Sequence, residues 1–364
     1  MFRITWPFHG AVLNRHHGSA QDASLQITVT GDCPPYGKVT VNGVPAKAAS
    51  GHFEAPVALT ERETDLVAVY EGAFGRHEHR VRVVWDKHSF PRYRFSIDDN
   101  SFFLRDIATK QYASIFDCFY LDMLRRLHRE YGAKFTVNVY YEAIAEFGQE
   151  QFLLPDFPDR YRGEWEGCAD WLGLAFHAYA NMPNRPYQYA SPEQLMRELT
   201  MVEEQITRFA GPQTLIPPTV IHWGMVLPEA YAALYEHGVR VLSGYGHPTS
   251  YGYDVNYWLD QARSEYMWHH DCLKDFDSGL VFSRVDIVCN TTPLDRIEAT
   301  LNSLLADPNH REIMDLFTHE QYFWDFYSNY IPDHPQRLDA ALRWVTDHAY
   351  RPVFFHEGFL GAPE

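Results

Sequence analysis

The sequence predicts two domains, a small β-sandwich followed by an α/β domain of the (β/α) barrel class. The first stretch of the chain holds short segments of alternating apolar and polar residues, separated by turn signals. After a linker around Pro91, strand-like segments alternate with helix-like ones, which is typical of parallel strands joined by crossover helices. A chain of 364 residues is long enough for two separate cores. We therefore expect one domain at residues 1–88 and another at residues 89–364.

The predicted N-terminal domain is all-β. Its expected strands are residues 25–30, 37–43, 52–59, 64–70 and 79–85. Asn42-Gly43 is a strong hairpin signal, and this strand spacing favours a sandwich. The run Val39–Gly43, followed by Gly51-His52-Phe53 and Val57-Ala58-Leu59, resembles the immunoglobulin-like accessory domains of many bacterial carbohydrate-active enzymes. The resemblance implies a spacer or packing role, with direct glycan binding as the alternative.

The predicted C-terminal domain contains seven or eight strands, so the barrel is expected to be incomplete or distorted. The expected strands are residues 94–98, 134–140, 172–176, 219–221, 239–242, 279–285, 313–318 and 351–355, and the expected helices are residues 116–131, 191–210, 227–238 and 334–348. Active sites of such barrels lie at the C-terminal ends of the strands. Here those ends carry Asp98-Asp99, His177, His222 and His319.

Composition limits the classes of partner. The net charge of −17 argues against nucleic acid and anionic membranes, and no apolar run is long enough to span a bilayer. Five scattered cysteines and an N-terminus without a signal-peptide pattern favour a cytoplasmic protein. The aromatic share of 15% suits stacking on sugar rings or filling a core. We expect a carbohydrate substrate, and self-association into a homo-oligomer is left open.

The adjacent carboxylates of Asp98 and Asp99 repel each other. A cation bound to one of them would offset the repulsion and leave the other free as a base, whereas the alternative is a polar turn. Imidazole and carboxylate are the usual ligands of a hydrolytic zinc or similar divalent ion. Three strand-end histidines near the pair therefore predict a metal site, most simply for Zn²⁺.

The order of these motifs resembles that of the polysaccharide deacetylase (NodB-like carbohydrate esterase) superfamily. The Ser96-Ile97-Asp98-Asp99-Asn100 segment resembles the first family motif, which implies Asp98 as catalytic base and Asp99 as metal ligand. The second motif implies His177 as a ligand, but Asn181 stands where the family has a second histidine. Residues 316–319 approximately match the late motif, which implies His319 as general acid. Asn100 replaces the family's glycine, and the arginine-containing motif has no clear match.

The third protein ligand is therefore open between His222 and Asn181. We prefer His222, because imidazole holds a zinc-type ion better than an amide does. A second metal site at His269-His270-Asp271 is a further alternative to a solvated loop there.

Several residues in predicted barrel-top loops are candidates for substrate binding. They are Trp223, Tyr322, Arg185, Tyr187 and Glu320. Together these features predict a divalent-metal-dependent hydrolase that removes an acyl group, most simply N-acetyl, from a carbohydrate. The alternatives are a metal-dependent hydrolase or glycan-cleaving enzyme of another class on the same barrel, and a non-catalytic glycan-binding protein without a complete metal site.

Overall fold

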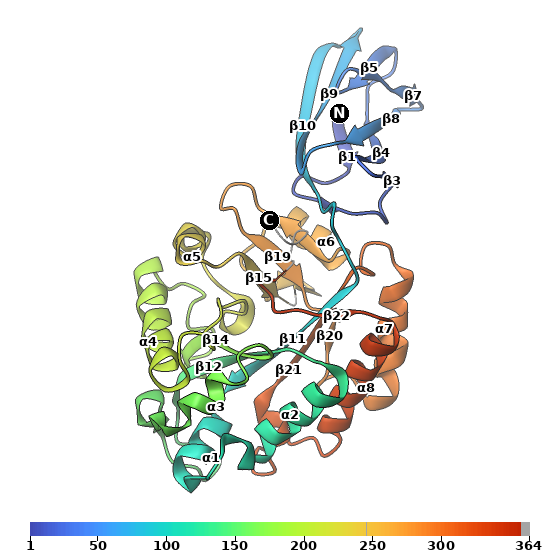
Figure 1. Ribbon diagram of the computed structural model, residues 1–364. Helices are drawn as coiled ribbons and strands as arrows, with labels where there is room; N and C mark the ends of the chain where they lie inside the picture. The colour runs from blue at the N-terminus through green and yellow to red at the C-terminus, as the bar shows by residue number, and fades with distance from the viewer. Residues whose placement is uncertain (245, 358–364) are drawn as a thin grey trace. The chain divides into compact units, whose positions relative to one another are not determined.

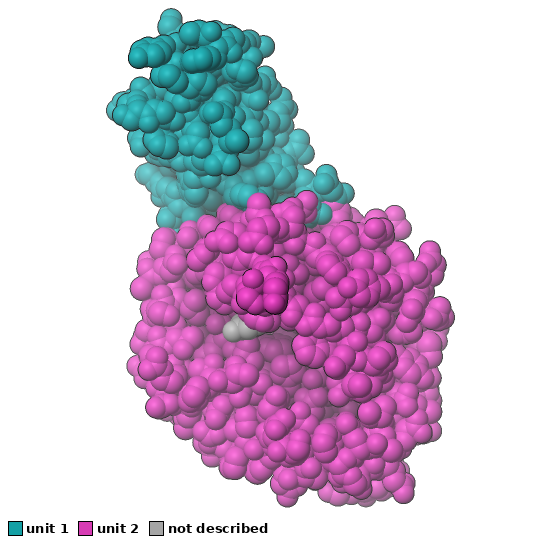
Figure 2. Space-filling view, turned by 180° about the vertical axis from the view of Figure 1, so that it is seen from behind, with its two compact units in different colours: residues 1–90, 272–277, 358–364 teal, residues 91–271, 278–357 magenta. Residues whose placement is uncertain are grey.

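The computed structural model describes residues 1–244 and 246–357, which form a mixed α/β protein with several sheets (Figure 1). The chain separates into two compact units (Figure 2). Unit 1 holds Met1–Phe90 and Cys272–Asp277, and unit 2 holds Pro91–Asp271 and Ser278–Glu357. The domain limits expected from the sequence, residues 1–88 and 89–364, remain a prediction. The predicted second domain also includes residues 358–364, which lie outside the described residues.

Unit 1 contains two five-stranded sheets. One has the order β1 (Arg3–Trp6), β4 (Ser24–Asp32), β8 (His52–Leu59) and β7 (Lys47–Ala49), with β3 (Ser19–Gln21) on β4. The other has the order β2 (Val12–Leu13), β10 (Gly75–Trp85), β9 (Glu63–Gly72), β5 (Gly37–Val41) and β6 (Val44–Pro45). All of these pairings are antiparallel except that of β2 with β10.

The alternation in the sequence explains why these segments form strands with one buried face. Along β8 every second residue, from Phe53 to Leu59, is buried and the residues between them are exposed. Asn42 and Gly43 both have positive φ, which is the backbone conformation that a two-residue hairpin of the primed type requires. The all-β character predicted for this region is confirmed, whereas its immunoglobulin-like nature stays a prediction.

Unit 2 is built on parallel strands. Its main sheet has the order β14 (Leu172–Ala180), β12 (Phe135–Ala143), β11 (Arg92–Asn100), β21 (Ile313–His319) and β20 (Ile287–Val288), all parallel. A second parallel pair joins β15 (Val241–Gly244) and β19 (Val281–Arg284). Smaller strands are β13 (Phe152–Leu153), β16 (His247–Thr249), β17 (Gly252–Asp254) and β22 (Arg351–Pro352), and β18 (Cys272–Lys274) belongs to unit 1.

Helices surround these strands (Figure 1). They are α1 (Phe102–Lys110), α2 (Phe119–Tyr131), α3 (Arg162–Glu166), α4 (Pro192–Ala210), α5 (Tyr231–His237), α6 (Gln261–Trp268), α7 (Ile297–Ala306) and α8 (His334–Asp347). Helix α4 begins where the sequence predicts, because Ser191 Oγ accepts a hydrogen bond from the Gln194 N–H and Pro192 occupies the first turn. It ends at Gly211, whose φ is +84°. Helices α1, α3, α6 and α7 were not expected from the sequence.

One predicted strand of the barrel is wrong. Residues 219–221 are an extended segment outside the regular ladders, although they lie between two strands. The carbonyl oxygen of Thr219 accepts a hydrogen bond from Ser243 of β15, and Ile216 donates to Leu174 of β14. Pro217 and Pro218 between these contacts have no N–H to donate, so a continuous ladder cannot form.

A buried polar network connects the two parallel groups of strands. Arg94 of β11 forms an ion pair with Asp315 of β21 at 3.1 Å, and both side chains are almost fully buried. Ser243 of β15 donates to the same Asp315 oxygen at 2.8 Å, and Ser283 of β19 lies 3.4 Å from it. These contacts place β15 and β19 across the interior from β11 and β21.

Two further observations concern sequence-based expectations. Among the described residues, no helix has both the length and the apolar character that crossing a bilayer would require. All five cysteines are buried free thiols.

Candidate metal centre

Two β-bulges turn the predicted site residues toward one another. Where β11 pairs with β12, Ile97 lies opposite Val137 and Asn100 opposite Val139, so Asp98 and Asp99 together face a single residue. Asp99 has a φ of +61°. Neighbouring residues of a regular strand point to opposite faces, but the extra residue of a bulge re-aims the side chain. The bulge thus allows two consecutive carboxylates to contribute to one site.

A second bulge lies on β14 at His177. Its neighbours Phe176 and Ala178 pair with Val139 and Tyr140, which are consecutive residues of β12, so His177 is the extra residue. His222 comes from the 3₁₀ turn η4 (His222–Gly224), which follows the extended segment described above. Both histidines are buried.

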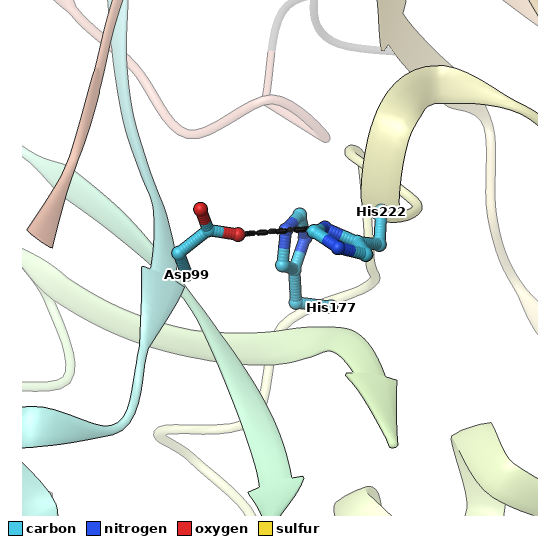
Figure 3. Close-up of side chains that lie close together, drawn as sticks. All are labelled: Asp99, His177 and His222. Atoms are coloured by element: carbon cyan, nitrogen blue, oxygen red, sulfur yellow. Dashed lines mark hydrogen bonds and ion pairs between the residues drawn. The ribbon is translucent and has the colours of Figure 1, made fainter. Parts of the chain in front are cut away.

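The side chains of Asp99, His177 and His222 meet at one point (Figure 3). His177 Nε2 lies 3.0 Å from Asp99 Oδ1 and 3.0 Å from His222 Nδ1. The distance from His222 Nδ1 to Asp99 Oδ1 is 3.4 Å. Ligand atoms about 2.0–2.2 Å from a common ion lie about 2.8–3.6 Å apart in octahedral or tetrahedral geometry. These three separations therefore match those of ligands around a divalent ion.

The protonation of His177 supports the same conclusion. Its Nδ1 lies 2.9 Å from the carbonyl oxygen of Val220, which can only accept, so Nδ1 carries the proton. Burial lowers the pKa of His177, which favours the neutral ring. Its Nε2 then presents a lone pair toward the Asp99 carboxylate, an arrangement that a bound cation would stabilise.

Asp99 is the negatively charged member of the group. Burial alone would raise its pKa, but the neighbouring imidazole groups of His177, His222 and His319 lower the pKa well below its usual value. Asp99 is consequently ionised at neutral pH, as a metal ligand must be.

Asp98 has a different environment. Its Oδ1 accepts hydrogen bonds from Asn138 Nδ2 at 2.6 Å and from Ser96 Oγ at 3.3 Å. Its Oδ2 lies 3.9 Å from His177 Nε2, on the side of the candidate centre. Burial, followed by the negative charge of Asp99, raises the pKa of Asp98 well above its usual value. The pKa values of the two carboxyl groups are therefore shifted in opposite directions, which is a common arrangement of acid–base sites.

His319 ends β21 beside the same carboxylates. It pairs in register with Asp98, and its Nε2 lies 3.9 Å from Asp99 Oδ2. Its Nδ1 lies 3.0 Å from Asn290 Oδ1, so Nδ1 is the donor and Nε2 faces the site. Burial lowers the pKa of His319.

Sequence reasoning missed several residues that hold this group together. Tyr140 Oη donates to Asp99 Oδ1 and lies 3.1 Å from His222 Nδ1, and Gln321 Nε2 donates to Asp99 Oδ2 at 2.8 Å. Asn100 braces the bulge, because its Nδ2 donates to the carbonyl oxygens of Ile97 and Asn138. The amide or phenol groups involved are common in cores, so no pattern in the sequence marks them.

The alternative ligand Asn181 reaches the group through another residue. Its Oδ1 accepts a hydrogen bond from Tyr140 Oη at 3.3 Å. Among the described His, Cys, Asp and Glu side chains at this position, Asp99, His177 and His222 lie within ligand distance of one another.

The predicted substrate-binding residues fall into two groups. Trp223 and Tyr322 lie beside the site, with their rings 6.2 Å from that of His222 and 6.0 Å from that of His319. Trp223 is 39% exposed. Both are thus placed where a ligand of this site could contact them.

The other three predicted substrate-binding residues are engaged within the protein. Arg185 forms two hydrogen bonds with Asp254, at 2.7 and 2.6 Å, and lies over the Trp223 ring. Tyr187 is buried and donates to Glu198. Glu320 is fully buried and accepts hydrogen bonds from the backbone N–H groups of residues 101–103 at the start of α1. These placements argue against a direct substrate contact for Tyr187 and Glu320, because their polar atoms already have partners inside the fold.

Comparison with known proteins gives only distant similarities. No family model and no curated protein matches the chain. A CE4 family pseudoenzyme from Bacillus anthracis is 8% identical, with 79% of this chain and 81% of that chain covered and a TM-score of 0.35. A mutant CE4 family pseudoenzyme with restored enzymatic activity is 10% identical, with 79% and 84% covered and a TM-score of 0.32. A Bacteroides ovatus GH5 xyloglucanase is 11% identical, with 95% and 100% covered and a TM-score of 0.30. Similarity at this level does not assign the chain to a family.

Proposed function

We propose that this protein is a divalent-metal-dependent hydrolase that removes an acyl group, N-acetyl in the simplest case, from a carbohydrate. The observation that carries the proposal is the convergence of Asp99 Oδ1, His177 Nε2 and His222 Nδ1, in which the hydrogen bond of His177 to Val220 directs a lone pair at the carboxylate. Asp99, His177 and His222 would hold the ion, and Zn²⁺ suits this set of nitrogen and oxygen ligands. When bound, the ion would polarise the acyl carbonyl group and make a water molecule more acidic.

Asp98 is the base in this proposal. Two hydrogen bonds fix its Oδ1, so Oδ2 is the oxygen that is left to take a proton from the attacking water. A pKa above the usual range of a carboxyl group brings the base closer to the operating pH, which favours proton transfer.

His319 is the proposed acid. Its Nδ1–H bond to Asn290 orients the ring, so Nε2 is the atom that would carry a proton to the departing amine. The ionised Asp99 near Nε2 favours the protonated form during that transfer. Trp223 and Tyr322 beside the two histidines would stack on sugar rings.

The proposal also includes the remaining sequence-based assignments. They comprise an immunoglobulin-like sandwich in unit 1, a distorted (β/α) barrel of seven or eight strands in unit 2, a divergent place in the polysaccharide deacetylase superfamily, and a cytoplasmic location. Unit 1 would act as a spacer or packing module. Nucleic acid and membranes are not expected as partners.

The proposal is tested by metal content and acyl release measured on the same preparations. Purified full-length protein should retain a divalent ion by mass spectrometry of metals and should release acetate from acetylated amino-sugar oligosaccharides. Asp99→Asn should hold one divalent ion fewer per chain than the wild type and should lose the activity. Asp98→Asn should keep the ion and lose the activity, because Asp98 is not one of the proposed ligands.

A matched control uses the same substitution at an exposed carboxylate. Asp156 is exposed, so Asp156→Asn should change neither property. Wild-type protein that holds no divalent ion after incubation with Zn²⁺, and full activity in Asp99→Asn, would contradict the proposal. Release of shortened sugar chains in place of acetate would instead favour a glycan-cleaving enzyme.

A second candidate function is glycan binding without catalysis. It is favoured by Tyr140 Oη, which hydrogen-bonds to Asp99 and lies near His222 among the proposed ligand atoms, and by Asn181 in the place of a histidine. Titration calorimetry separates the two functions. Sugar binding that is unaffected by a chelator and by Asp99→Asn would favour the binding protein.

A further inference from the structure

A second group of buried ligand-type side chains lies at the other end of β21. It consists of Asp271 after α6, Asp286 between β19 and β20, and His310 before β21. All three residues are at least nine-tenths buried. His319 ends β21 whereas Ile313 begins it, so this group is separate from the candidate metal centre. In barrels the end of the strands opposite the active site is associated with stability.

Each carboxylate of this group is oriented by the backbone through one oxygen. Asp271 Oδ2 accepts a hydrogen bond from the Ile313 N–H at 3.2 Å, and Asp286 Oδ2 accepts one from the Asp315 N–H at 2.8 Å. The other oxygen, Oδ1 of each residue, is buried and has no hydrogen-bond partner among the described residues. Carboxylates that bind metal ions are commonly fixed in this way, with one oxygen hydrogen-bonded and the other aimed at the ion.

The two unpartnered oxygens converge on one histidine nitrogen. His310 Nδ1 lies 3.6 Å from Asp271 Oδ1 and 3.6 Å from Asp286 Oδ1. This separation is too long for a hydrogen bond. It equals the spacing of about 3.6 Å expected between two ligand atoms that are each about 2.2 Å from a tetrahedral ion.

Burial and neighbouring charges shift the pKa values of both carboxyl groups. Burial, followed by the negative charge of Asp271, raises the pKa of Asp286 to about 7, and burial raises the pKa of Asp271 well above its usual value. Arg284 Nη1 lies 3.6 Å from Asp286 Oδ1, beyond hydrogen-bond distance. It is also within hydrogen-bond distance of both ring nitrogens of His310, at 3.4 Å from each. Arg284 thus faces two buried carboxylates without a hydrogen bond to either unpartnered oxygen, and the positive charges of Arg92 and Arg94 also act on Asp271.

We propose that Asp271, Asp286 and His310 bind a second divalent ion of the Zn²⁺ class, which acts as a structural link between three connecting segments of unit 2. The imidazole ligand favours Zn²⁺ over Mg²⁺ or Ca²⁺, which prefer oxygen ligands alone. Because the three residues come from separate connections, binding free energy at this site contributes directly to folding free energy.

The neighbouring histidines do not share this geometry. The side chain of His269 is 60% exposed, and His270 Nδ1 hydrogen-bonds to the carbonyl oxygen of Tyr266. The second metal site considered at residues 269–271 is therefore replaced by one in which Asp271 is joined by Asp286 and His310.

The test uses protein in which the candidate metal centre has been disabled. Full-length protein with both Asp99→Asn and His177→Gln is stripped with a chelator, incubated with Zn²⁺ alone, desalted and analysed for metal. We expect about one Zn²⁺ per chain, together with a rise in Tm on adding Zn²⁺. Co²⁺ in place of Zn²⁺ should give visible absorption bands from a site with imidazole and carboxylate ligands.

Two single changes in this background act as test and control. His310→Gln should abolish retention of Zn²⁺ and the rise in Tm, whereas His269→Gln, the same change at an exposed neighbour, should leave both intact. If His310→Gln does not fold, the Co²⁺ spectrum and Zn²⁺ content of the parent variant decide the question. A parent variant that is folded by circular dichroism but retains no Zn²⁺ overturns the inference, and so does His310→Gln with undiminished retention. Neither result depends on whether the protein hydrolyses a sugar.

Discussion

Replacing Asn138 with alanine tests whether Asp98 acts as the base. Asn138 is fully buried and its Nδ2 donates to Asp98 Oδ1 at 2.6 Å, which makes it the shorter of the two hydrogen bonds to that oxygen. A hydrogen bond to a charged acceptor contributes about 1.5–3 kcal/mol. If this stabilises the ionised Asp98 that accepts the proton, Asn138→Ala should lower kcat/KM by about 10- to 150-fold.

The direction of the pH effect follows from the same contact. The hydrogen bond from Asn138 lowers the pKa of Asp98, which burial and the charge of Asp99 raise. Without the donor, ionised Asp98 is less favoured, so the acidic limb of the profile of kcat/KM against pH should move to higher pH. Ser96→Ala removes the longer 3.3 Å contact to the same oxygen and should cause a smaller loss.

The assay is acetate release from acetylated amino-sugar oligosaccharides between about pH 5 and 9, a range that brackets catalytic groups poised near neutrality. Metal content is measured on each variant, so that a loss of ion is not mistaken for a loss of base. The reasoning is refuted if Asn138→Ala retains its metal and has the wild-type kcat/KM and acidic limb. Equal losses in Asn138→Ala and Ser96→Ala would also contradict it, since the two contacts differ in length.

Three further predictions concern stability. In metal-free protein, Asp98→Asn should raise the free energy of unfolding by about 1–3 kcal/mol at pH 8 but not at pH 4. The pKa of Asp98 is raised in the folded state, so the contribution of its protonated carboxyl group to stability is present at low pH and is lost as pH rises through the folded pKa. Equal effects of the substitution at both pH values in denaturant melts would contradict this. Trp165→Ala should cost about 3–5 kcal/mol, because the ring is fully buried against Phe157 and Phe209, whereas Trp165→Phe should cost much less. Glu320→Ala should cost about 1–3 kcal/mol by removing the acceptor for the N–H groups at the start of α1, and an unchanged Tm would show that water replaces it.

The parallel strands of unit 2 were predictable because each carries a continuous or alternating apolar run with a polar residue at its end. Asp99, His177 and His222 were found through that end position, and the structure brings their ligand atoms together. The same expectation, that a polar residue at the end of an extended segment lies at the site, also located His222, although residues 219–221 are not a regular strand. The extended backbone still carries the side chain to the same edge, and two prolines change only its hydrogen bonding.

What the sequence could not show is which polar groups already have partners. Glu320 and Tyr187 belong to segments that read as exposed loops, but both side chains turn inward to satisfy donors and acceptors inside the fold. Conversely, Asn138 and Tyr140 occupy a strand that reads as core, yet their polar atoms contact the carboxylates of Asp98 and Asp99. Such pairings join residues that are far apart in the chain, so no local pattern encodes them.

The bulge at Asp98 and Asp99 has a consequence for how the site could be lost. Two functional side chains occupy consecutive positions of one strand because that strand is one residue longer than its partner between Ile97 and Asn100. Removing a single residue here would straighten the strand, relieve the positive φ of Asp99 and restore an uninterrupted ladder with β12. The resulting chain would keep its fold with only one of the two carboxylates aimed at the histidines. Under the proposed function, deletion of one codon would therefore remove one carboxylate of the pair from the site while β11 kept its pairing with β12.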